Sequence, residues 1–309
     1  MRVIFMGNPE FAIPSLKSLL QSSHKVVGVV SNPPKPTGRG QKLHSTPVGR
    51  FSIENNIHLI EAENLNSASL HQKIMALNPD IFVVVAYRIL PKTLISLPKF
   101  GAINLHASLL PKYRGAGPIQ WALMNGDKKT GVTIFQINNN VDTGEILLNK
   151  EIPILSNDIM ITLGTRLCTI GATLIIKALD GIQNQTIKPI KQNHNYASNA
   201  PKITKNMTLI NWEWNAEKIH NWIRGLSPFP GMSTTWKGKR IRIFNTRVEN
   251  KSIESEYGCI YDISHEEVFV NTGRLLLAFS EVQLEGKKRM SIHDFLLGYN
   301  FQKGDLLGL

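Results

Sequence analysis

The sequence predicts an α/β domain, built on a mostly parallel sheet with helices on both faces, followed by a small β-barrel. The first half of the chain alternates short runs rich in Val and Ile with amphipathic helical patterns, which is typical of such sheets. Residues 182–206 are polar and have no clear period, so we expect a linker there. After the linker, short strands recur between Gly, Asn and Lys turns, as they do in small barrels. A length of 309 residues also favours two domains.

The first predicted strand, Val3–Met6, ends at the turn Gly7-Asn8-Pro9, and a helix is expected over Phe11–Leu20. Ile81–Ala86 is a continuous apolar run rich in Val, which is typical of a strand buried on both faces. The other elements expected in this half are the strands Lys25–Val30, His58–Ile60, Gly101–His106, Val132–Ile137 and Glu145–Ile152, and the helix Leu65–Leu77. The first turn lacks the G-x-G-x-x-G pattern, so a dinucleotide site is not supported.

The longest apolar stretch, Asp158–Leu179, is expected to be a buried amphipathic helix that ends at Asp180-Gly181. Arg166 and several Thr and Gly residues interrupt it, which argues against a membrane span. The two cysteines, Cys168 and Cys259, have no neighbouring Cys or His at metal-ligand spacing. We therefore expect a cytoplasmic protein without a membrane partner and without a bound metal.

Beyond the linker we expect a helix over Ala216–Arg224 and a barrel. The strands expected in the barrel are Arg240–Phe244, Gly258–Ile263, Glu267–Asn271 and Leu275–Phe279. The tryptophans near its start are Trp212, Trp214, Trp222 and Trp236. Packing of the helix against the barrel is the favoured role for these rings, and a stacking platform for nucleic acid is the alternative.

The net charge of +12 favours a polyanionic partner such as RNA, DNA, an anionic membrane or a phosphorylated substrate. Residues 1–200 hold 20 Lys and Arg against 11 Asp and Glu, whereas residues 201–309 hold 15 against 12. The excess therefore lies mostly in the first domain. A basic face on the second domain remains open; its members would be Lys202, Lys205, Lys237, Lys239, Arg240, Arg242 and Arg247.

Two polar residues, Asn104 and His106, occupy alternate positions at the end of the predicted strand Gly101–His106. Because side chains alternate along a strand, both belong to one face of the sheet. The carboxyl ends of strands are where ligands bind in open α/β sheets. A stiff, turn-rich stretch follows, with Pro111, Gly115, Gly117 and Pro118.

A second polar turn joins the strands Val132–Ile137 and Glu145–Ile152, and it contains Asp142. Asp-x-Gly is an ordinary turn signal, so this carboxylate taken alone has a structural interpretation. The same holds for a single His on a strand. The case for a site rests on the two segments together.

Together these segments resemble the folate-dependent formyltransferase family. The shared pattern is Asn-x-His-x-Ser-Leu-Leu-Pro-x-Tyr-Arg-Gly over 104–115, followed by Gly-x-Thr at 131–133 and Asp-x-Gly at 142–144. The resemblance implies a Rossmann-like catalytic domain and a catalytic trio of Asn104, His106 and Asp142. Ala107 and Asn138–Asn140 depart from the residues common in the family, and this leaves the neighbouring hydrogen bonds open.

The residue types suit formyl transfer. When an amine attacks the formyl carbon, negative charge develops on the formyl oxygen, and Asn104 and a protonated His106 can donate hydrogen bonds to it. Asp142 can keep His106 protonated and relay protons. The resemblance further implies 10-formyltetrahydrofolate as the donor. The residues it places in the folate pocket are Arg88, Ile89, Leu90, Ser108, Leu109, Leu110 and Pro111, with Met6 and Phe11 as further lining.

The stretch Ser31–Leu43 is long for a connection within such a unit, and it carries Lys35, Arg39 and Lys42 with no acidic residue. It resembles the tRNA-binding loop of those family members that formylate methionyl-tRNA, above all in Gly38-Arg39-Gly40-x-Lys42-Leu43. A solvated surface loop is the alternative. The likeness implies that Arg39 contacts the acceptor stem of an initiator methionyl-tRNA.

The second domain adds to this resemblance, through Ala200–Lys205 and through Ile223–Gly231. It implies an open barrel of the oligonucleotide-binding (OB) type that contributes Lys205 and Arg240 to tRNA binding. We expect a catalytic domain over 1–187, a linker over 188–206, an OB-like domain over 207–309, and a monomer. Two alternatives stay open: formylation of an amino-sugar nucleotide, and a non-catalytic RNA-binding protein on the same scaffold.

Overall fold

The structure, a computed structural model, describes residues 1–37 and 40–308 of the chain. It divides into two compact units. The N-terminal unit comprises Met1–Pro118, Lys129–Pro153 and Gly164–Pro201. The C-terminal unit comprises Lys202–Leu309 together with two stretches from earlier in the chain, Ile119–Lys128 and Ile154–Leu163.

The N-terminal unit is built on one sheet with the strand order β5-β2-β1-β6-β7-β8-β9. The strands β5, β2, β1, β6 and β7 run parallel, whereas β8 is antiparallel to both β7 and β9. Their bounds are β1 Arg2–Gly7, β2 Lys25–Ser31, β5 Leu59–Glu61, β6 Ile81–Val85, β7 Ala102–His106, β8 Lys129–Gln136 and β9 Ile146–Pro153. The mostly parallel sheet predicted from the sequence is confirmed, with ends that differ by a few residues.

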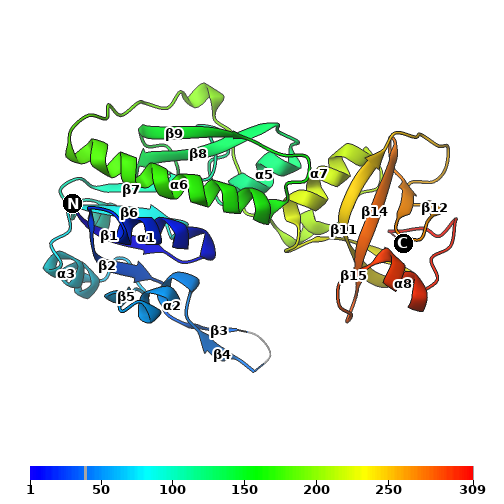
Figure 1. Ribbon diagram of the computed structural model, residues 1–309, viewed down its shortest axis with the longest axis horizontal. Helices are drawn as coiled ribbons and strands as arrows, with labels where there is room; N and C mark the ends of the chain where they lie inside the picture. The colour runs from blue at the N-terminus through cyan, green and yellow to red at the C-terminus, as the bar shows by residue number, and fades with distance from the viewer. Residues whose placement is uncertain (38–39, 309) are drawn as a thin grey trace. The chain divides into compact units, whose positions relative to one another are not determined.

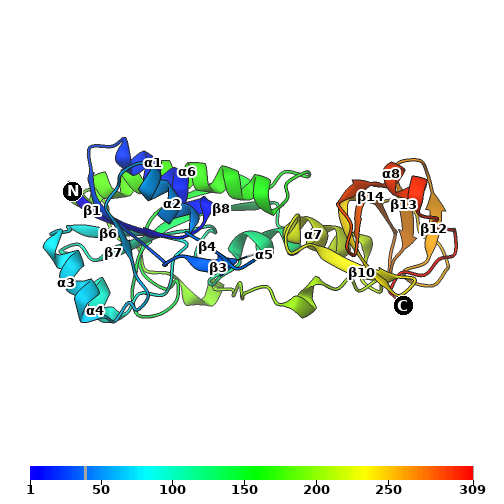
Figure 2. The same cartoon turned by 90° about the horizontal axis from the view of Figure 1, so that it is seen from below.

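Helices cover both faces of this sheet. Figure 2 shows α1 and α6 on one side of the strands and α3 and α4 on the other. The bounds are α1 Ile13–Leu20, α2 Pro47–Glu54, α3 Ala68–Ala76, α4 Lys92–Ile95 and α6 Met160–Gln183. The buried strand β6 follows from its unbroken Ile-Phe-Val-Val-Val sequence, which leaves no polar side chain to face water.

The long helix α6 is apolar enough, by length and composition, to cross a membrane. Its apolar face instead packs on the sheet: Leu167, Ile175 and Leu179 are fully buried, and a Cβ added at Gly171 would lie 2.6 Å from the side chain of Leu105 in β7. α6 is therefore a core helix, as predicted. Figure 1 shows it running along the sheet.

The strands β3 and β4 and the helices α2 and α4 of this unit were not predicted. The stretch after β2 forms a hairpin of β3, Lys35–Thr37, and β4, Lys42–His44, which pair antiparallel. Helix α2 follows, and Thr46 caps its N-terminus by accepting a hydrogen bond from the amide of Gly49 at 2.9 Å. The Ser-Thr-Pro sequence at 45–47 is a helix-start signal that the sequence analysis missed.

The C-terminal unit is an antiparallel β domain, as predicted, with the strand order β10-β11-β14-β13-β12 and β15 paired to β14. Its strands are β10 Met232–Trp236, β11 Lys239–Glu249, β12 Ile260–Ile263, β13 Val268–Asn271, β14 Leu276–Leu284 and β15 Met290–Ser291. Its helices are α7 Ala216–Leu226 and α8 Ile292–Gly298, and it takes most of α5, Pro118–Met124.

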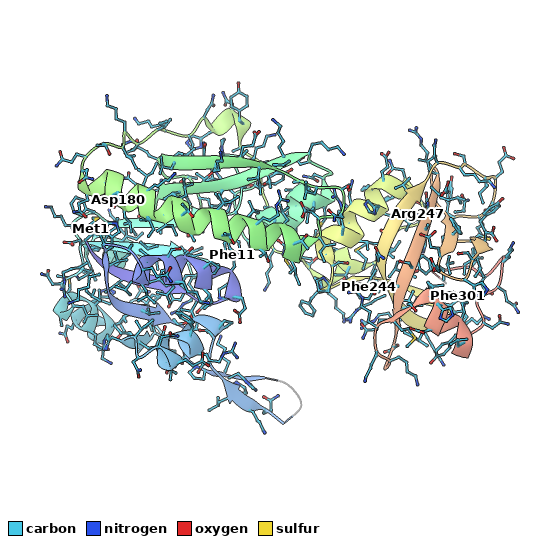
Figure 3. The ribbon with its side chains drawn as sticks, in the orientation of Figure 1. Met1, Phe11, Asp180, Phe244, Arg247 and Phe301 are labelled. Atoms are coloured by element: carbon cyan, nitrogen blue, oxygen red, sulfur yellow. The ribbon has the colours of Figure 1, made fainter. Side chains whose placement is uncertain are left out.

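Apolar side chains from both the helices and the strands fill this domain. Phe244 and Phe301, labelled in Figure 3, are almost fully buried, whereas Arg247 lies on the outside and pairs with Glu249 and Glu267. Trp212 and Trp236 are buried, and their indole N–H groups donate to Thr234 and Asp305. This is the packing role favoured for the tryptophans from the sequence.

Candidate active site

The carboxyl end of β7 carries the two polar residues predicted from the sequence. Asn104 lies opposite Val84 of β6 and Phe135 of β8, and His106 lies opposite Thr133 of β8. Alternation along the strand places Asn104 and His106 on the same face of the sheet. His106 is 6% exposed, whereas Asn104 is partly exposed.

The two nitrogens of the His106 ring have different partners. Nε2 lies 2.8 Å from the carbonyl oxygen of Tyr113, which can only accept, so Nε2 carries a hydrogen and donates. Nδ1 lies 3.6 Å from Oδ2 of Asp142. The edge of the ring also contacts Phe135, with the ring centroids 6.4 Å apart. Nδ1 is therefore the nitrogen that faces the carboxylate and can exchange a proton.

Asp142 comes from the turn between β8 and β9, far from His106 in the sequence. Its Oδ2 accepts a hydrogen bond from the backbone N–H of Gly115 at 2.8 Å, and its side chain is 15% exposed. Gly115 has a φ of +119°, and a Cβ there would lie 2.7 Å from the carbonyl oxygen of Ala200. Only glycine lets the backbone at 115 adopt this φ and lie against Ala200, the position from which its amide donates to Asp142.

The side chain of Asn104 has no hydrogen-bond partner within residues 1–37 and 40–308. A partly exposed carboxamide has two N–H donors and an oxygen acceptor, and here they remain open to a ligand. The structure thus brings Asn104, His106 and Asp142 to one end of the sheet and joins the last two directly. This arrangement can donate hydrogen bonds to an oxygen that gains negative charge and can pass a proton.

The loop after β7 is fixed by the buried hydroxyl of Thr133 in β8. This hydroxyl donates to the carbonyl of Ser108 at 2.7 Å and accepts from the amide of Leu110 at 3.1 Å. The Ser108 hydroxyl in turn donates to the carbonyl of Lys112 at 2.6 Å. Ser108 and Leu110 are buried, whereas Leu109 and Pro111 are partly exposed. The first two therefore shape the loop, and the last two present surface to a ligand.

The segment after β6 carries the other residues predicted for folate. The guanidinium of Arg88 donates to the carbonyl oxygens of Ala62 and Glu63 and to the hydroxyl of Tyr87. Burial raises the pKa of Tyr87, and Arg88 opposes that shift. Leu90 is buried in the core, and Ile89 is 76% exposed. Arg88 therefore holds the chain in place, and Ile89 is the apolar side chain that a ligand can reach.

The hairpin β3–β4 carries the predicted tRNA contacts. Lys35 and Lys42 are exposed, and Arg39 lies outside the described residues. Hydroxyl groups fix the base of the hairpin: Ser31 Oγ lies 2.5 Å from Thr46 Oγ1, 2.9 Å from the carbonyl oxygen of Gly7 and 3.0 Å from Oδ1 of Asn8. The same Asn8 oxygen accepts from the amide of Asn32 at 2.9 Å. The hairpin is thus anchored to the first turn at the carboxyl end of the sheet.

Two further cations were predicted to bind tRNA. Lys205 and Arg240 are exposed, and both belong to the C-terminal unit. Arg240 lines a shallow pocket together with Arg242, Gln283, Leu284, Glu285 and Gly286. Both cations are therefore accessible to a phosphate. Within the parts of the chain that the structure describes, no group of three or more His, Cys, Asp or Glu side chains is placed to hold a metal ion.

Gln192 is a residue of the site that was not predicted from the sequence. Its side chain is 7% exposed and makes hydrogen bonds to Asp142, Gly144 and Arg114. It lies in the polar stretch expected to be a linker, where nothing in composition or periodicity distinguishes it. Pairing of that stretch with β9 and with Arg114 becomes visible only in three dimensions.

Comparisons with known proteins match both units of the chain. The formyl transferase family matches residues 1–179, and the C-terminal domain of formyl transferases matches residues 202–300. The methionyl-tRNA formyltransferase of Alkaliphilus oremlandii is 41% identical over 309 residues, which cover the whole of both chains.

Two solved structures share the fold at lower identity. An N-formyltransferase from Helicobacter canadensis, in complex with folinic acid and dTDP-3-aminofucose, has a TM-score of 0.68 at 21% identity; the match covers 94% of this chain and all of the other. The methionyl-tRNA formyltransferase of Clostridium thermocellum has a TM-score of 0.56 at 16% identity, over 88% of this chain and all of the other.

Proposed function

The chain belongs to the formyltransferase family, among its methionyl-tRNA formyltransferases, and from this premise we propose how its residues carry out the reaction. The reaction transfers a formyl group from a folate derivative to the amino group of methionyl-tRNA. In our proposal the donor is 10-formyltetrahydrofolate and the acceptor is the initiator methionyl-tRNA. The product, N-formylmethionyl-tRNA, serves translation initiation.

One observation carries the proposal: His106 has Nε2 committed to Tyr113 and Nδ1 turned to Asp142 at 3.6 Å. Because Nε2 is engaged, Nδ1 is the ring nitrogen that can exchange a proton. The Asp142 carboxylate stabilises the positive charge of the ring when Nδ1 holds a proton. The pair can therefore take up the proton that the amine loses and return one to the folate nitrogen.

Asn104 completes the site. The bond that forms joins the amine nitrogen to the formyl carbon, and the bond that breaks joins the formyl carbon to the folate nitrogen. Negative charge develops on the formyl oxygen between these two events. The open N–H groups of Asn104 stabilise that charge by donating to the oxygen, and they act most strongly where water is excluded.

We place the folate against the loops after β6 and β7. In this proposal the exposed Ile89 and the partly exposed Leu109 and Pro111 supply apolar contacts. Arg88, Leu90, Ser108 and Leu110 hold the two loops in shape through the hydrogen bonds and core packing described above. Backbone groups of both loops are then available to the polar edge of a pterin.

We place the tRNA on the hairpin β3–β4 and on the C-terminal unit. Lys35, Arg39 and Lys42 would contact the phosphates and the end of the acceptor stem, and Lys205 and Arg240 would contact the backbone further along. We assign catalysis to residues 1–187, the connection to 188–206 and tRNA binding to 207–309. We also infer a monomeric protein of the cytoplasm that acts without a membrane or a metal.

The decisive experiment is incubation with 10-formyltetrahydrofolate and charged initiator methionyl-tRNA. We expect formylmethionine on the tRNA, and none with uncharged tRNA or with an amino-sugar nucleotide. Formylation of the sugar nucleotide without RNA would reverse the acceptor assignment.

Loss of transfer in Asn104→Ala and His106→Ala, with tRNA affinity retained, would exclude the non-catalytic alternative. Arg39→Ala should weaken the use of tRNA, and an unchanged tRNA dependence would count against the hairpin assignment.

A further inference from the structure

Gln192 uses its whole hydrogen-bonding capacity around the turn that carries Asp142. Its Nε2 donates to the carbonyl oxygen of Asp142 at 2.9 Å and to that of Gly144 at 2.7 Å. Its Oε1 accepts from Nε of Arg114 at 3.2 Å and from Nη2 of Arg114 at 2.6 Å. Two donors and two acceptor positions are all that a glutamine amide possesses.

The turn held by Gln192 combines a strained backbone with exposed side chains, and Thr143 donates to Oδ1 of Asn138 within it. Asp142 has a φ of +52°, in the left-handed region that costs free energy for a residue with a side chain. The residues just before it, Asn138–Val141, are exposed, so they bring little core packing. At Gly144 a Cβ would lie 1.6 Å from the carbonyl oxygen of Gln136, so the backbone there packs too closely for any side chain. A strained turn with one close-packed end persists when neighbouring groups fix it.

The segment that carries Gln192 is itself fixed on both sides. Before Gln192, the amide and carbonyl groups of Ile190 and Ile146 pair reciprocally, both at 2.8 Å. After Gln192, Arg114 donates its amide to Ser198 at 2.8 Å, and its carbonyl accepts from the amide of Ala200 at 2.7 Å. Figure 1 shows this segment passing from the end of α6 along β9. Gln192 therefore lies between two backbone anchors, which gives its amide a defined position.

We propose that Gln192 is a positioning residue that holds the carboxylate of Asp142 at its distance from His106. This inference deepens the proposed function and rests on it. Gln192 acts on the backbone of the turn, and the Gly115 amide acts on the carboxylate itself, so the two together set where Oδ2 lies. Arg114 precedes Gly115 in the chain, and its guanidinium, which can only donate, uses Gln192 and His194 as acceptors.

Two substitutions test the proposal. Gln192→Glu keeps the size and the acceptor for Arg114 but loses the donors to the two carbonyl groups. Gln192→Met keeps the approximate volume and loses all four hydrogen bonds. Gln72→Met, an exposed glutamine of α3, is the matched control. If Gln192→Met fails to fold, Gln192→Glu still carries the test.

For both Gln192 variants we expect kcat of formyl transfer to fall by about 10- to 100-fold, because small displacements of a reacting group have effects of this size. KM for both substrates and the Kd for tRNA should stay within about twofold of the parent values, since a positioning role does not predict weaker binding. For Gln192→Glu, the ratio of variant to parent kcat should rise as pH falls, because a protonated carboxyl regains one donor. A purely structural role does not predict that rise.

Amide hydrogen exchange of residues 141–144 gives a readout that does not depend on activity. We expect faster exchange there in both Gln192 variants and parent-like exchange in Gln72→Met. Parent-like kcat together with parent-like exchange would overturn the positioning role, and so would a raised KM for tRNA at unchanged kcat. If the parent enzyme formylates no methionyl-tRNA, the proposed function fails, whereas the exchange result still decides whether Gln192 fixes the turn.

Discussion

Nδ1 of His106 lies 3.6 Å from Oδ2 of Asp142, and the same oxygen accepts the backbone N–H of Gly115 at 2.8 Å. The carboxylate is thus held by a neutral donor that has no role in proton transfer. Asp142→Asn can keep a hydrogen bond to Gly115 through its amide oxygen, while the negative charge is lost. This separates the effect of charge from the effect of position.

We therefore expect Asp142→Asn to lower kcat by a factor on the order of 10² to 10⁴, the range for loss of acid–base assistance. KM for methionyl-tRNA should change little, because the carboxylate is 15% exposed and offers little binding surface. Initial rates at saturating substrates measure this. Asp294→Asn, at an exposed aspartate of α8, is the control. A kcat within twofold of the parent would remove Asp142 from the mechanism.

Asn104→Ala should lower kcat by on the order of 10² to 10³, because one hydrogen-bond donor to developing negative charge is worth about 3 kcal/mol of barrier. The thermal unfolding midpoint should change little, since the Asn104 side chain makes no hydrogen bond within the described part of the chain. The exposed Asn149→Ala in β9 controls for loss of an amide. A large loss of stability in Asn104→Ala, with kcat preserved, would show that the amide is structural.

Lys35→Ala and Lys42→Ala should each reduce the slope of log Kd for tRNA against log salt by about 1, the change for one lost phosphate contact. The parent and variant affinities should converge as salt rises, because the lost term is electrostatic. Lys73→Ala, an exposed lysine on α3, should leave the slope unchanged. Equal slopes in the parent and in both hairpin variants would contradict the placement of tRNA on β3–β4.

Stability should depend on pH through His220 of α7. Burial, and to a smaller extent the nearby positive charge of Arg224, lower the pKa of His220 to about 4. Its Nδ1 lies 2.9 Å from the hydroxyl of Thr246. The unfolded chain binds a proton near pH 6.5 and the folded chain does not, so the free energy of unfolding falls as pH drops from about 6.5 towards 4. A difference of about 2.5 pKa units corresponds to roughly 3 kcal/mol.

Denaturant unfolding between pH 4 and pH 7 measures this dependence. His220→Leu should flatten the curve in that window, whereas the exposed His265→Gln should leave it unchanged. Above pH 7 the free energy of unfolding should not depend on position 220 through protonation. A parent-like slope in His220→Leu would assign the pH dependence to other groups.

The sequence predicts those parts of the site that depend on strand geometry alone, which are the positions of Asn104 and His106. Alternation along β7 is enough to place Asn104 and His106 on one face, and the apolar run of β6 is enough to bury that strand beside it. The approach of Asp142 to His106 has no such local signal. It depends on the antiparallel return of β8 and on a left-handed backbone at Asp142, and family resemblance alone pointed to it.

Other features were invisible because their cause is non-local. Gln192 lies in a stretch with no period, and its role comes from partners about 50 and 80 residues away in the chain. The hairpin β3–β4 has a proline and exposed cations in place of alternating apolar residues, so no strand signal exists there. The change in sequence pattern near residue 206, from alternating helices and strands to short strands, likewise does not predict that residues 119–128 join the C-terminal unit.

Membership of residues 119–128 in the C-terminal unit has a practical consequence for the study of that unit alone. Met124 belongs to its apolar core, Trp121 packs against that core, and a Cβ added at Gly225 of α7 would lie 2.8 Å from Met124. A fragment that begins at residue 202 lacks these side chains, and the apolar surface of α7 that they cover is then exposed to solvent. Such a fragment should self-associate or have a lowered thermal unfolding midpoint. Fusing residues 119–128 back onto it should restore a monomeric, stable domain.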